Sequence, residues 1–234
     1  MLTKRPSSER GHIDHGWLNT YHTFSFADYH DPAHVHFRSL WVINEDRIAG
    51  GGGFGMHPHR DMEIITYIIS GALEHKDSMG NKGAIRPGDV QRMSAGTGVV
   101  HSEYNSSPNE PVHLLQIWIF PERHGITPSY EQRTFHDQDK RNTLCRIASH
   151  DGQNDSIQIN TDASVYASII SDGAVLTHHF IEGRGGYLQV IRGGLTVNGI
   201  HLNHGDGIAL ENEPEIRIAE RDNGEAEFLL FDLA

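Results

Sequence analysis

The alternation of apolar and polar positions along the 234 residues of this chain predicts a protein built almost entirely from β-strands. Short runs rich in Val, Ile, Leu, Tyr and Phe are separated by Gly, Asn, Asp and Pro, a pattern typical of strands joined by tight turns. No long run has the period of an amphipathic helix. The predicted strands cover residues 23–26, 39–44, 63–70, 72–76, 90–93, 99–104 and 113–120 in the first half of the chain, and residues 165–171, 174–181, 186–191, 195–197, 208–210, 216–219 and 228–231 in the second.

The two halves resemble each other across a charged connector over residues 121–141. The segment Tyr67-Ile-Ile-Ser-Gly71 is matched by Val190-Ile-Arg-Gly193, and the step Gly88-Asp89 is matched by Gly205-Asp206. Gly-Asp steps suit tight turns between antiparallel strands. The chain is therefore interpreted as a diverged repeat of one all-β unit.

Composition narrows the classes of function. Nineteen basic and thirty-one acidic residues give a formal net charge of −12, which repels nucleic-acid phosphates, so we expect no direct binding of nucleic acid. The single cysteine, Cys145, excludes an internal disulfide and fits a reducing compartment. The first ten residues lack the apolar core of a signal peptide, and no stretch is long and apolar enough for a membrane span. We expect a cytoplasmic protein without membrane contact.

Two short motifs carry the candidate chemistry. His57 and His59 are one residue apart, as are His101 and Glu103 further along the chain. Because side chains alternate faces along a strand, each pair presents two ligands to the same side. Three imidazoles and one carboxylate suit a divalent first-row metal. The sequence therefore predicts one metal site in the first half, with open positions for water, dioxygen or a chelating substrate.

Other histidines and the second half offer weaker candidates. His34-x-His36 has the same spacing, but it lies in a polar Asp-Pro segment and is expected to be solvated. Aligning the repeated turns places Ile218, Glu220, His179 and Ile181 opposite His101, Glu103, His57 and His59, respectively. The second half is therefore expected to keep the scaffold and to lose most of the ligands.

These motifs resemble those of the cupins, which are small jelly-roll-like β-barrels. Gly51, His57, His59 and Glu63 fit the first cupin motif, and Gly88, Gly96, His101 and Asn105 follow the second. Gly71 comes one residue late, Ser94 replaces the usual Pro, and the step from Gly96 to His101 is two residues too long. With these departures the chain resembles the pirin family of two-domain cupins. The resemblance also rests on the segments Gly16-Trp17-Leu18, His22 to Tyr29, Leu115 to Ile119, and Gly125 to Gln132.

The resemblance implies a fold, a ligand set and a division of the chain. The fold is all-β, with two tandem cupin barrels (a bicupin): an N-terminal domain over 1–135 with the metal site, and a degenerate C-terminal domain over 136–234 without one. The implied cofactor is one divalent ion per chain, with Fe(II) first and Cu, Zn, Ni, Mn or Co as alternatives. Glu63 is the carboxylate ligand in many other cupins, but in pirins Glu103 takes that role and Glu63 becomes a supporting residue. The implied metal ligands are His57, His59, His101 and Glu103.

The resemblance also implies an activity. Some bacterial pirins are quercetin 2,3-dioxygenases (quercetinases), oxidoreductases that cleave this flavonol with O2 and release carbon monoxide. Glu103 would then be both ligand and general base. The alternative is a non-catalytic regulator that senses metal or redox state and binds a protein partner; a storage-type cupin with a structural metal fits the pirin motifs less well. Residues expected as pocket candidates, though more often found in a barrel core, are Phe24, Phe26, Tyr29, Tyr67, Trp118, His22 and His75.

Overall fold

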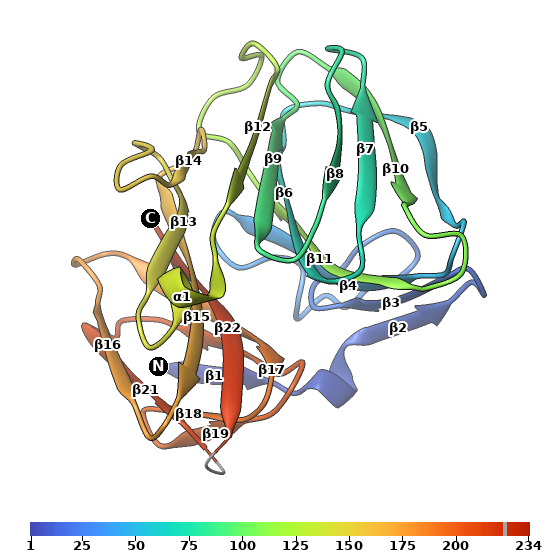
Figure 1. Cartoon of the computed structure of the whole chain (residues 1–234). Helices are drawn as coiled ribbons and strands as arrows, with labels where there is room; N and C mark the ends of the chain where they lie inside the picture. The colour runs from blue at the N-terminus through green and yellow to red at the C-terminus, as the bar shows by residue number, and fades with distance from the viewer. Residues whose placement is uncertain (222–223) are drawn as a thin grey trace. The chain divides into compact units, whose positions relative to one another are not determined.

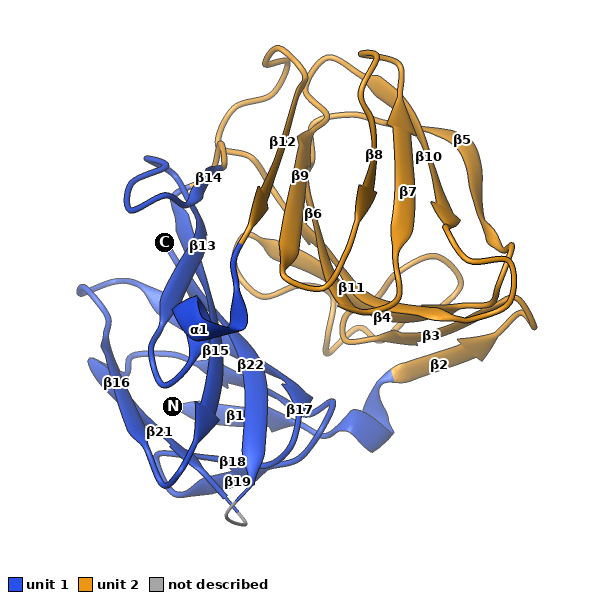
Figure 2. Ribbon diagram, in the orientation of Figure 1, with its two compact units in different colours: residues 1–10, 135–158, 162–234 blue, residues 11–134, 159–161 orange. Residues whose placement is uncertain are grey.

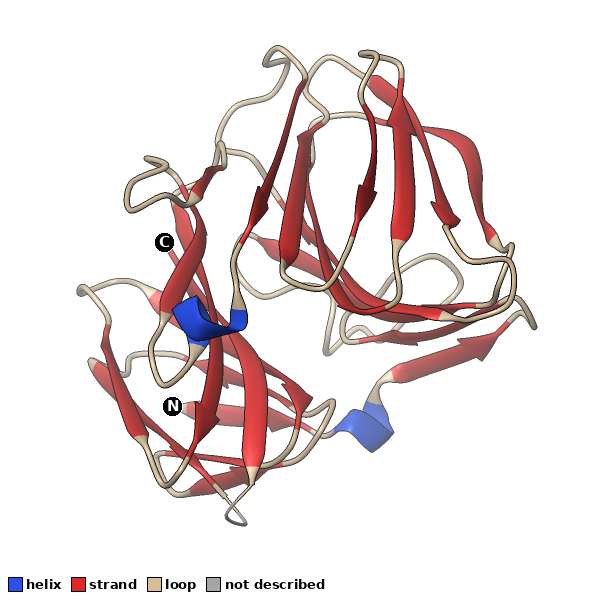
Figure 3. Cartoon of the chain, in the orientation of Figure 1, coloured by secondary structure: helices blue, strands red, loops and turns tan. Residues whose placement is uncertain are grey.

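The computed structural model describes residues 1–221 and 224–234, and it consists almost entirely of strands (Figures 1 and 3). The strands are divided between two structural units, which are coloured separately in Figure 2. We call residues 11–134 and 159–161 the first barrel, and residues 1–10, 135–158 and 162–234 the second barrel. The prediction of an all-β chain in two halves is confirmed.

The first barrel contains eleven of the described strands. They are β2 (Gly11–Asp14), β3 (Leu18–His22), β4 (Leu40–Ile48), β5 (Gly53–His59), β6 (Glu63–Ser70), β7 (Leu73–Asp77), β8 (Lys82–Ile85), β9 (Asp89–Ser94), β10 (Val99–Asn105), β11 (Val112–Ile119) and β12 (Ser129–Thr134).

The second barrel contains the remaining strands and two short helices. They are β1 (Leu2–Arg5), the 3-10 helix η1 (Ser7–Glu9), α1 (Asp137–Lys140), β13 (Cys145–Ser149), β14 (Ile157–Gln158), β15 (Ala163–Ser171), β16 (Val175–His179), β17 (Gly185–Arg192), β18 (Leu195–Val197), β19 (Ile200–Leu202), β20 (Gly207–Leu210), β21 (Glu215–Glu220) and β22 (Glu225–Leu233).

Each barrel pairs a seven-stranded sheet with a four-stranded one, and the strand orders match in the small sheets and in the four central strands of the large ones. The large sheets run β12-β9-β6-β11-β4-β3-β2 in the first barrel and β1-β20-β17-β22-β15-β13-β14 in the second. The small sheets run β5-β10-β7-β8 and β16-β21-β18-β19. The segments β9-β6-β11-β4 and β20-β17-β22-β15 correspond strand by strand in chain order, as the small sheets do, which confirms the predicted internal repeat. The outer strands of the large sheets differ, because β1 takes the place of β12 and β13-β14 the place of β3-β2.

The repeated glycines Gly71 and Gly193 show why the repeat survives at the level of single residues. Both have positive φ, +80° and +73°, at the turn between the two sheets. A Cβ on Gly71 would lie 2.9 Å from the Pro111 carbonyl oxygen, and one on Gly193 would lie 2.3 Å from the Glu225 carbonyl oxygen. Only glycine meets both demands without strain.

The core of each barrel lies between its two sheets, where the inward-facing residues of alternating strands meet. The second barrel holds the larger apolar cluster, which includes Phe180, Ile216, Ile218 and Phe228. The first barrel has smaller clusters, around Leu73 and around Ile64. Its interior between them is left to polar side chains, which positions the candidate site.

The structure differs from the sequence prediction in several places, and β1, β2, β3, β5, β8, β13, β14 and β19 form where no strand was predicted. Residues 23–26 follow β3 as a loop, because the strand itself is Leu18–His22. The connector 121–141 contains β12, which pairs with β9 in register from Ser129↔Ser94 to Thr134↔Asp89. Residues 1–10, grouped by sequence with the first half, lie in the second barrel because β1 pairs with β20 from Leu2↔Leu210 to Arg5↔Gly207.

No helix among residues 1–221 and 224–234 has the length and apolar character needed to cross a lipid bilayer.

We predict that Gly71→Ala destabilises the protein more than Gly80→Ala. Both positions have positive φ, which costs an alanine roughly 1–2 kcal/mol. Only at Gly71 would the new Cβ also meet backbone atoms closer than 3.0 Å, whereas Gly80 has open space. Urea denaturation should give a larger loss of unfolding free energy for Gly71→Ala, by at least about 1 kcal/mol; equal losses would contradict the close approach.

Candidate metal centre

Strands β5 and β10 place the candidate ligands on one inner face of the first barrel. In their antiparallel register His101 lies opposite His57, Val99 opposite His59, and Glu103 opposite Phe54. The register shifts between His101 and Glu103, because β5 carries one extra residue there. This bulge turns both Phe54 and His57 toward the same interior, although they are three residues apart.

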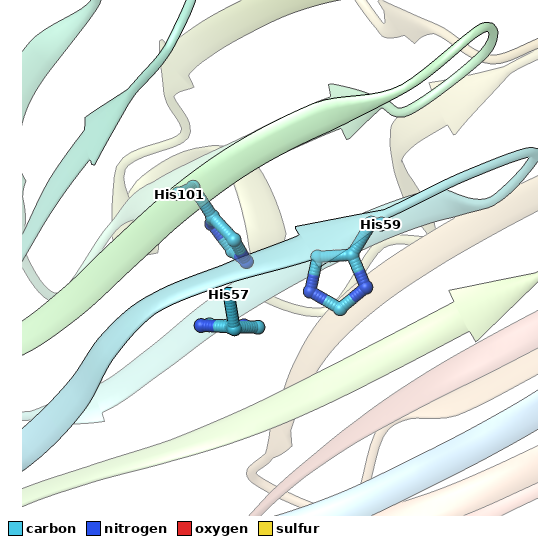
Figure 4. Close-up of side chains that lie close together, drawn as sticks. All are labelled: His57, His59 and His101. Atoms are coloured by element: carbon cyan, nitrogen blue, oxygen red, sulfur yellow. The ribbon is translucent and has the colours of Figure 1, made fainter.

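The three imidazoles converge as the sequence predicted. Their ring centroids are 4.4 Å apart for His57 and His101, 4.8 Å for His57 and His59, and 4.8 Å for His59 and His101. Figure 4 shows the three side chains, carried by the two strands, lying close together. One nitrogen of each ring lies within 4.8 Å of one nitrogen of the other two, which is close enough for a shared metal ion.

Hydrogen bonds leave the Nε2 atoms of His57 and His101 available. Nδ1–H of His57 donates to the Gly55 carbonyl oxygen at 2.8 Å. Nε2–H of the buried His75 donates to Asp77 Oδ2 at 3.1 Å, so its Nδ1 is an acceptor, and His101 Nδ1 lies 3.5 Å from it. With its proton on Nδ1, His101 has a bare Nε2, and that buried atom has no hydrogen-bond partner among the described residues. Such an atom fits a metal ligand.

The surroundings favour the neutral, metal-binding form of these rings. Burial lowers the pKa of His101 to about 2, and the neighbouring imidazoles of His57, His59 and His75 add to the effect. Burial, followed by the nearby His57, lowers the pKa of His59 to about 4. Neutral imidazoles keep a nitrogen lone pair, which is what a metal requires.

Glu103 lies next to the histidine cluster and is almost fully buried. Its Oε2 accepts a hydrogen bond of 2.9 Å from Gln116 Nε2, while Oε1 has no partner among the described residues. Burial raises the pKa of Glu103 to about 7, hydrogen bonds from Gln116 and Thr66 oppose the rise, and the nearby Asp46 increases it. One carboxyl oxygen of Glu103 lies within 4.8 Å of a ring nitrogen of His101 and of one of His75. Glu103 also lines the same cavity as His57 and His59.

Glu63 does not face this cluster. Its carboxylate accepts hydrogen bonds from the Ser94 hydroxyl at 2.9 Å, from the Asn160 backbone N–H at 3.2 Å and from Asn160 Nδ2 at 3.3 Å. These contacts hold residues 159–161 against the first barrel. The geometry therefore supports a structural role for Glu63, as the sequence predicted.

A cavity of about 180 Å³ opens beside the histidine cluster. It adjoins a second cavity of about 270 Å³, because both are lined by Phe26, Asn44, Asp46 and Phe54. Together they reach the roughly 300–1,000 Å³ of small-molecule sites. Residues that line only the first cavity are His57, His59, Glu103, Gln116 and Trp118.

The lining corrects several pocket predictions. Phe26 and Trp118 line the first cavity, and His22 lines the second. Phe24, Tyr29 and Tyr67 line neither, and His75 instead supports His101 from behind. Four residues that line the first cavity were not predicted from sequence: Phe54, Asn44, Asp46 and Gln116.

One signal for these residues was present in the sequence. The polar run Asn44-Glu45-Asp46 interrupts an otherwise apolar strand, which indicates a polar interior at that level of the barrel. His34 and His36 stay outside the site, as expected, bonded to Asp31 and to the Arg38 carbonyl oxygen.

The second barrel carries different residues at the corresponding positions. Leu195 follows Gly193 as Leu73 follows Gly71, and it pairs with Glu220 as Leu73 pairs with Asn105. Two and four residues before Glu220 on β21, Ile218 and Ile216 take the positions of Glu103 and His101. On the paired strand, His178 and Phe180 take the positions of His57 and His59. His178 alone could ligate a metal, and it donates from Nε2 to Asp232 Oδ2 at 2.8 Å.

The register corrects the sequence alignment of the repeat. Twelve residues separate Asp89 from His101, but ten separate Asp206 from Ile216, so counting from the Gly-Asp steps shifted the second half by two. On the opposite strand, three residues (60–62) separate His59 from the start of β6, but four (181–184) separate Phe180 from the start of β17, which shifted the count by one. Ile218, Glu220, His179 and Ile181 are therefore not the counterparts of His101, Glu103, His57 and His59.

Comparison with known protein families now decides the relationship. The Pirin family model matches residues 3–119, and a model described as the quercetinase C-terminal cupin domain matches residues 146–233. The chain belongs to the pirin family. The resemblance noted in the sequence is thereby confirmed, and the two barrels are the two cupin domains of a bicupin.

Its relatives cover the full chain. A protein named quercetin 2,3-dioxygenase from Escherichia coli strain K12 is 46% identical over 233 residues, which are 100% of this chain and 99% of that protein. A putative quercetin 2,3-dioxygenase from Pseudomonas aeruginosa is 43% identical over 235 residues and 100% of both chains. Among solved structures, Escherichia coli YhhW in complex with nickel(II) superposes with a TM-score of 0.94, at 45% identity, covering 100% of this chain and 99% of that one.

We predict that His75→Phe weakens metal binding although residue 75 is no ligand. The substitution keeps a ring of similar size but removes the acceptor for His101 Nδ1, so His101 is no longer held with a bare Nε2. Titration calorimetry with nickel(II) should show an affinity lower by about tenfold or more. Tyr130→Phe is the control, since the Tyr130 ring packs 5.0 Å from that of His75 while its hydroxyl donates to Gln132 Oε1. Equal affinity of His75→Phe and the unmodified protein would contradict the positioning role.

Asp46 should make the stability of the metal-free protein depend on pH. Burial raises the pKa of Asp46 from 3.8 to about 6, the negative charge of Glu45 adds to the rise, and the Thr20 hydroxyl opposes it. The folded state therefore holds this proton more tightly than the unfolded state, so the stability contributed by protonated Asp46 is lost as pH rises from about 4 to about 6.

Asp46→Asn removes a carboxyl whose ionisation in the folded state costs up to about 3 kcal/mol. We predict that the melting temperature of the variant relative to the unmodified protein is higher at pH 8 than at pH 4. Thermal denaturation followed by circular dichroism measures both, and a temperature difference that does not change between the two pH values would contradict the assigned burial.

Proposed function

We propose that this pirin binds one divalent metal ion through His57, His59, His101 and Glu103 and uses it to cleave a flavonol with O2. The observation that carries the proposal is the convergence of three neutral imidazoles and a buried carboxyl at one end of an aromatic-lined cavity. The orphaned Nε2 of His101 and Oε1 of Glu103 are the atoms that a metal would satisfy. The names of its full-length relatives support the reaction, and the nickel(II) complex of YhhW supports the metal.

The donor set leaves room for a chelating substrate. A divalent ion that takes six ligands would be held by these four side chains and would keep two positions for other ligands. When bound, a divalent ion would hold the adjacent 3-hydroxyl and 4-carbonyl oxygens of a flavonol and lower the pKa of that hydroxyl. The set accommodates Fe(II), the first expectation from sequence, as well as Ni, Cu, Mn, Co and Zn.

Glu103 is assigned to accept the proton of the 3-hydroxyl. Gln116 holds one carboxylate oxygen at 2.9 Å and so fixes the orientation of the group, while the other oxygen is free of protein donors among the described residues. Gln116 is itself held, because its Oε1 accepts a hydrogen bond of 2.8 Å from the Thr66 hydroxyl. A carboxylate fixed this way is oriented before the substrate arrives.

The remaining walls suit a flat aromatic substrate. Phe26, Phe54 and Trp118 line the cavity, and the Trp118 indole stands edge-on to the His59 ring at 4.9 Å between centroids. Such walls bury apolar rings and exclude bulk water from the reacting atoms. In the overall reaction both atoms of O2 enter the products, and one ring carbon leaves as carbon monoxide.

We further infer that the second barrel holds no metal and serves as scaffold. Phe180, Ile216 and Ile218 stand where the first barrel has His59, His101 and Glu103, and these side chains are part of a packed apolar cluster. Apolar side chains offer no ligand atom to a metal ion. The Ile-for-His and Ile-for-Glu exchanges support one ion per chain.

The proposal predicts that the metal-loaded protein consumes quercetin in air and that Glu103→Gln lowers the rate at least about a hundredfold. The measurement is the loss of flavonol absorbance together with release of carbon monoxide, for protein loaded with each candidate metal. Glu74→Gln is the matched control, because it is the same carboxyl-to-amide substitution at an exposed position of the neighbouring strand β7.

Two other outcomes decide against the proposal. Equal turnover by Glu103→Gln and the unmodified protein would remove Glu103 from the reaction. A metal-loaded protein that leaves every flavonol intact, but captures a protein partner in only one metal oxidation state, would favour the regulator.

A further inference from the structure

Asp46 is a buried carboxyl that the reaction as described does not use. It lies on β4 between β3 and β11, opposite Thr20 on one side and Leu114 on the other. The residue is 5% exposed, and its Oδ1 accepts no hydrogen bond from any residue that the structure describes. A buried carboxyl oxygen without a donor is costly to the fold, which calls for an explanation in terms of function.

The position of Asp46 supplies the explanation. Asp46 lines both the cavity beside the histidines and the adjoining one, so it stands where the two meet. The aromatic side chains of Phe26 and Phe54 line both cavities at the same place. A planar molecule bound at the histidines and extending into the second cavity would pass this carboxyl edge-on.

The fold itself does not need this carboxyl. The strand pairing shows which residue of the second barrel corresponds to Asp46. In the first barrel Leu115 lies between Tyr67 and Glu45, and in the second Leu229 lies between Gln189 and Ala167, so Glu45 corresponds to Ala167. The counterpart of Asp46 is therefore Ser168, one residue after Ala167. The same strand forms in the second barrel with a small uncharged side chain at this position, which argues that Asp46 is retained for the ligand.

The chemistry of the cavity defines what Asp46 can bind. Asp46 is close enough to Glu103 for its negative charge to raise the pKa of Glu103. The two carboxyls therefore repel an anionic ligand. An ionised carboxylate only accepts hydrogen bonds, so its partner is a neutral donor. In a flat apolar ligand that fits between the aromatic walls of the cavity, such a donor is a ring hydroxyl.

We propose that Asp46 determines substrate specificity by accepting a hydrogen bond from a ring hydroxyl of the flavonol, remote from the chelating pair. The inference rests on the proposed function and adds its substrate class: flavonols that carry further phenolic hydroxyls, in preference to the unsubstituted flavonol. The neighbouring Asn44, held by a 2.7 Å hydrogen bond from His22 Nδ1 to its Oδ1, presents an amide beside Asp46 for a second hydroxyl. A site built to bond a hydroxyl discriminates strongly against the analogue that lacks it.

The test compares quercetin with 3-hydroxyflavone, which has the chelating pair and no other hydroxyl. For the metal-loaded protein we expect kcat/KM to favour quercetin by at least about tenfold, and Asp46→Asn to lower that preference to within about twofold by weakening quercetin alone. The dissociation constant of quercetin, from anaerobic titration of the nickel(II)-loaded protein, should rise in parallel. Glu45→Gln is the matched control, since Glu45 is next to Asp46 but pairs with His113 and Arg47, away from both cavities.

The possible results distinguish the role of Asp46 from the proposed function. Asp46→Asn that weakens both flavonols equally, or leaves the preference for quercetin unchanged, overturns the specificity role while leaving the proposed function standing. An unmodified protein that neither binds nor consumes either flavonol overturns the proposed function, and the role of Asp46 falls with it.

Discussion

The crowding of three imidazoles inside one barrel is the constraint on which the rest of the first domain depends. Rings with centroids 4.4–4.8 Å apart cannot all carry charge, so the site is stable only with neutral rings or around a shared cation. That arrangement requires each ring to be held from outside, which the Gly55 carbonyl does for His57 and the Asp77–His75 pair does for His101. It also replaces apolar packing, so the core of this barrel is divided into small clusters.

The second barrel shows the same scaffold without that constraint. Ile216 and Ile218 fill the interior that His101 and Glu103 occupy in the first, and one continuous apolar cluster results. The interior between the two sheets is thus polar at this level in the first barrel and apolar in the second. Two copies of one scaffold therefore allow polar ligands in one barrel and apolar packing at the same positions in the other.

Much of this was predictable from sequence, and the failures have physical causes. Period-two patterns and turn residues predicted the all-β repeat, and the spacing of His57, His59 and His101 predicted their shared face, because both depend on local geometry. The alignment of the two halves failed because two loops differ in length: the one before His101 is longer than its counterpart, and the one after His59 is shorter. Pairing register is set by partners far away in sequence, so the count along the chain did not show this. Asp46 was missed because the run Asn44-Glu45-Asp46 indicates a polar interior but does not say which side chain lines a cavity.

The strand pairing at the N-terminus sets an order of assembly. Leu2–Arg5 pairs with Gly207–Leu210, so this strand is synthesised some 200 residues before its partner, about 10–40 s at ordinary rates of synthesis. Residues 11–134 can close their own sheets in that interval. The N-terminal segment must meanwhile stay extended and unpaired, and its late docking, secured by Lys4 on Asp206, covers the exposed edge of β20.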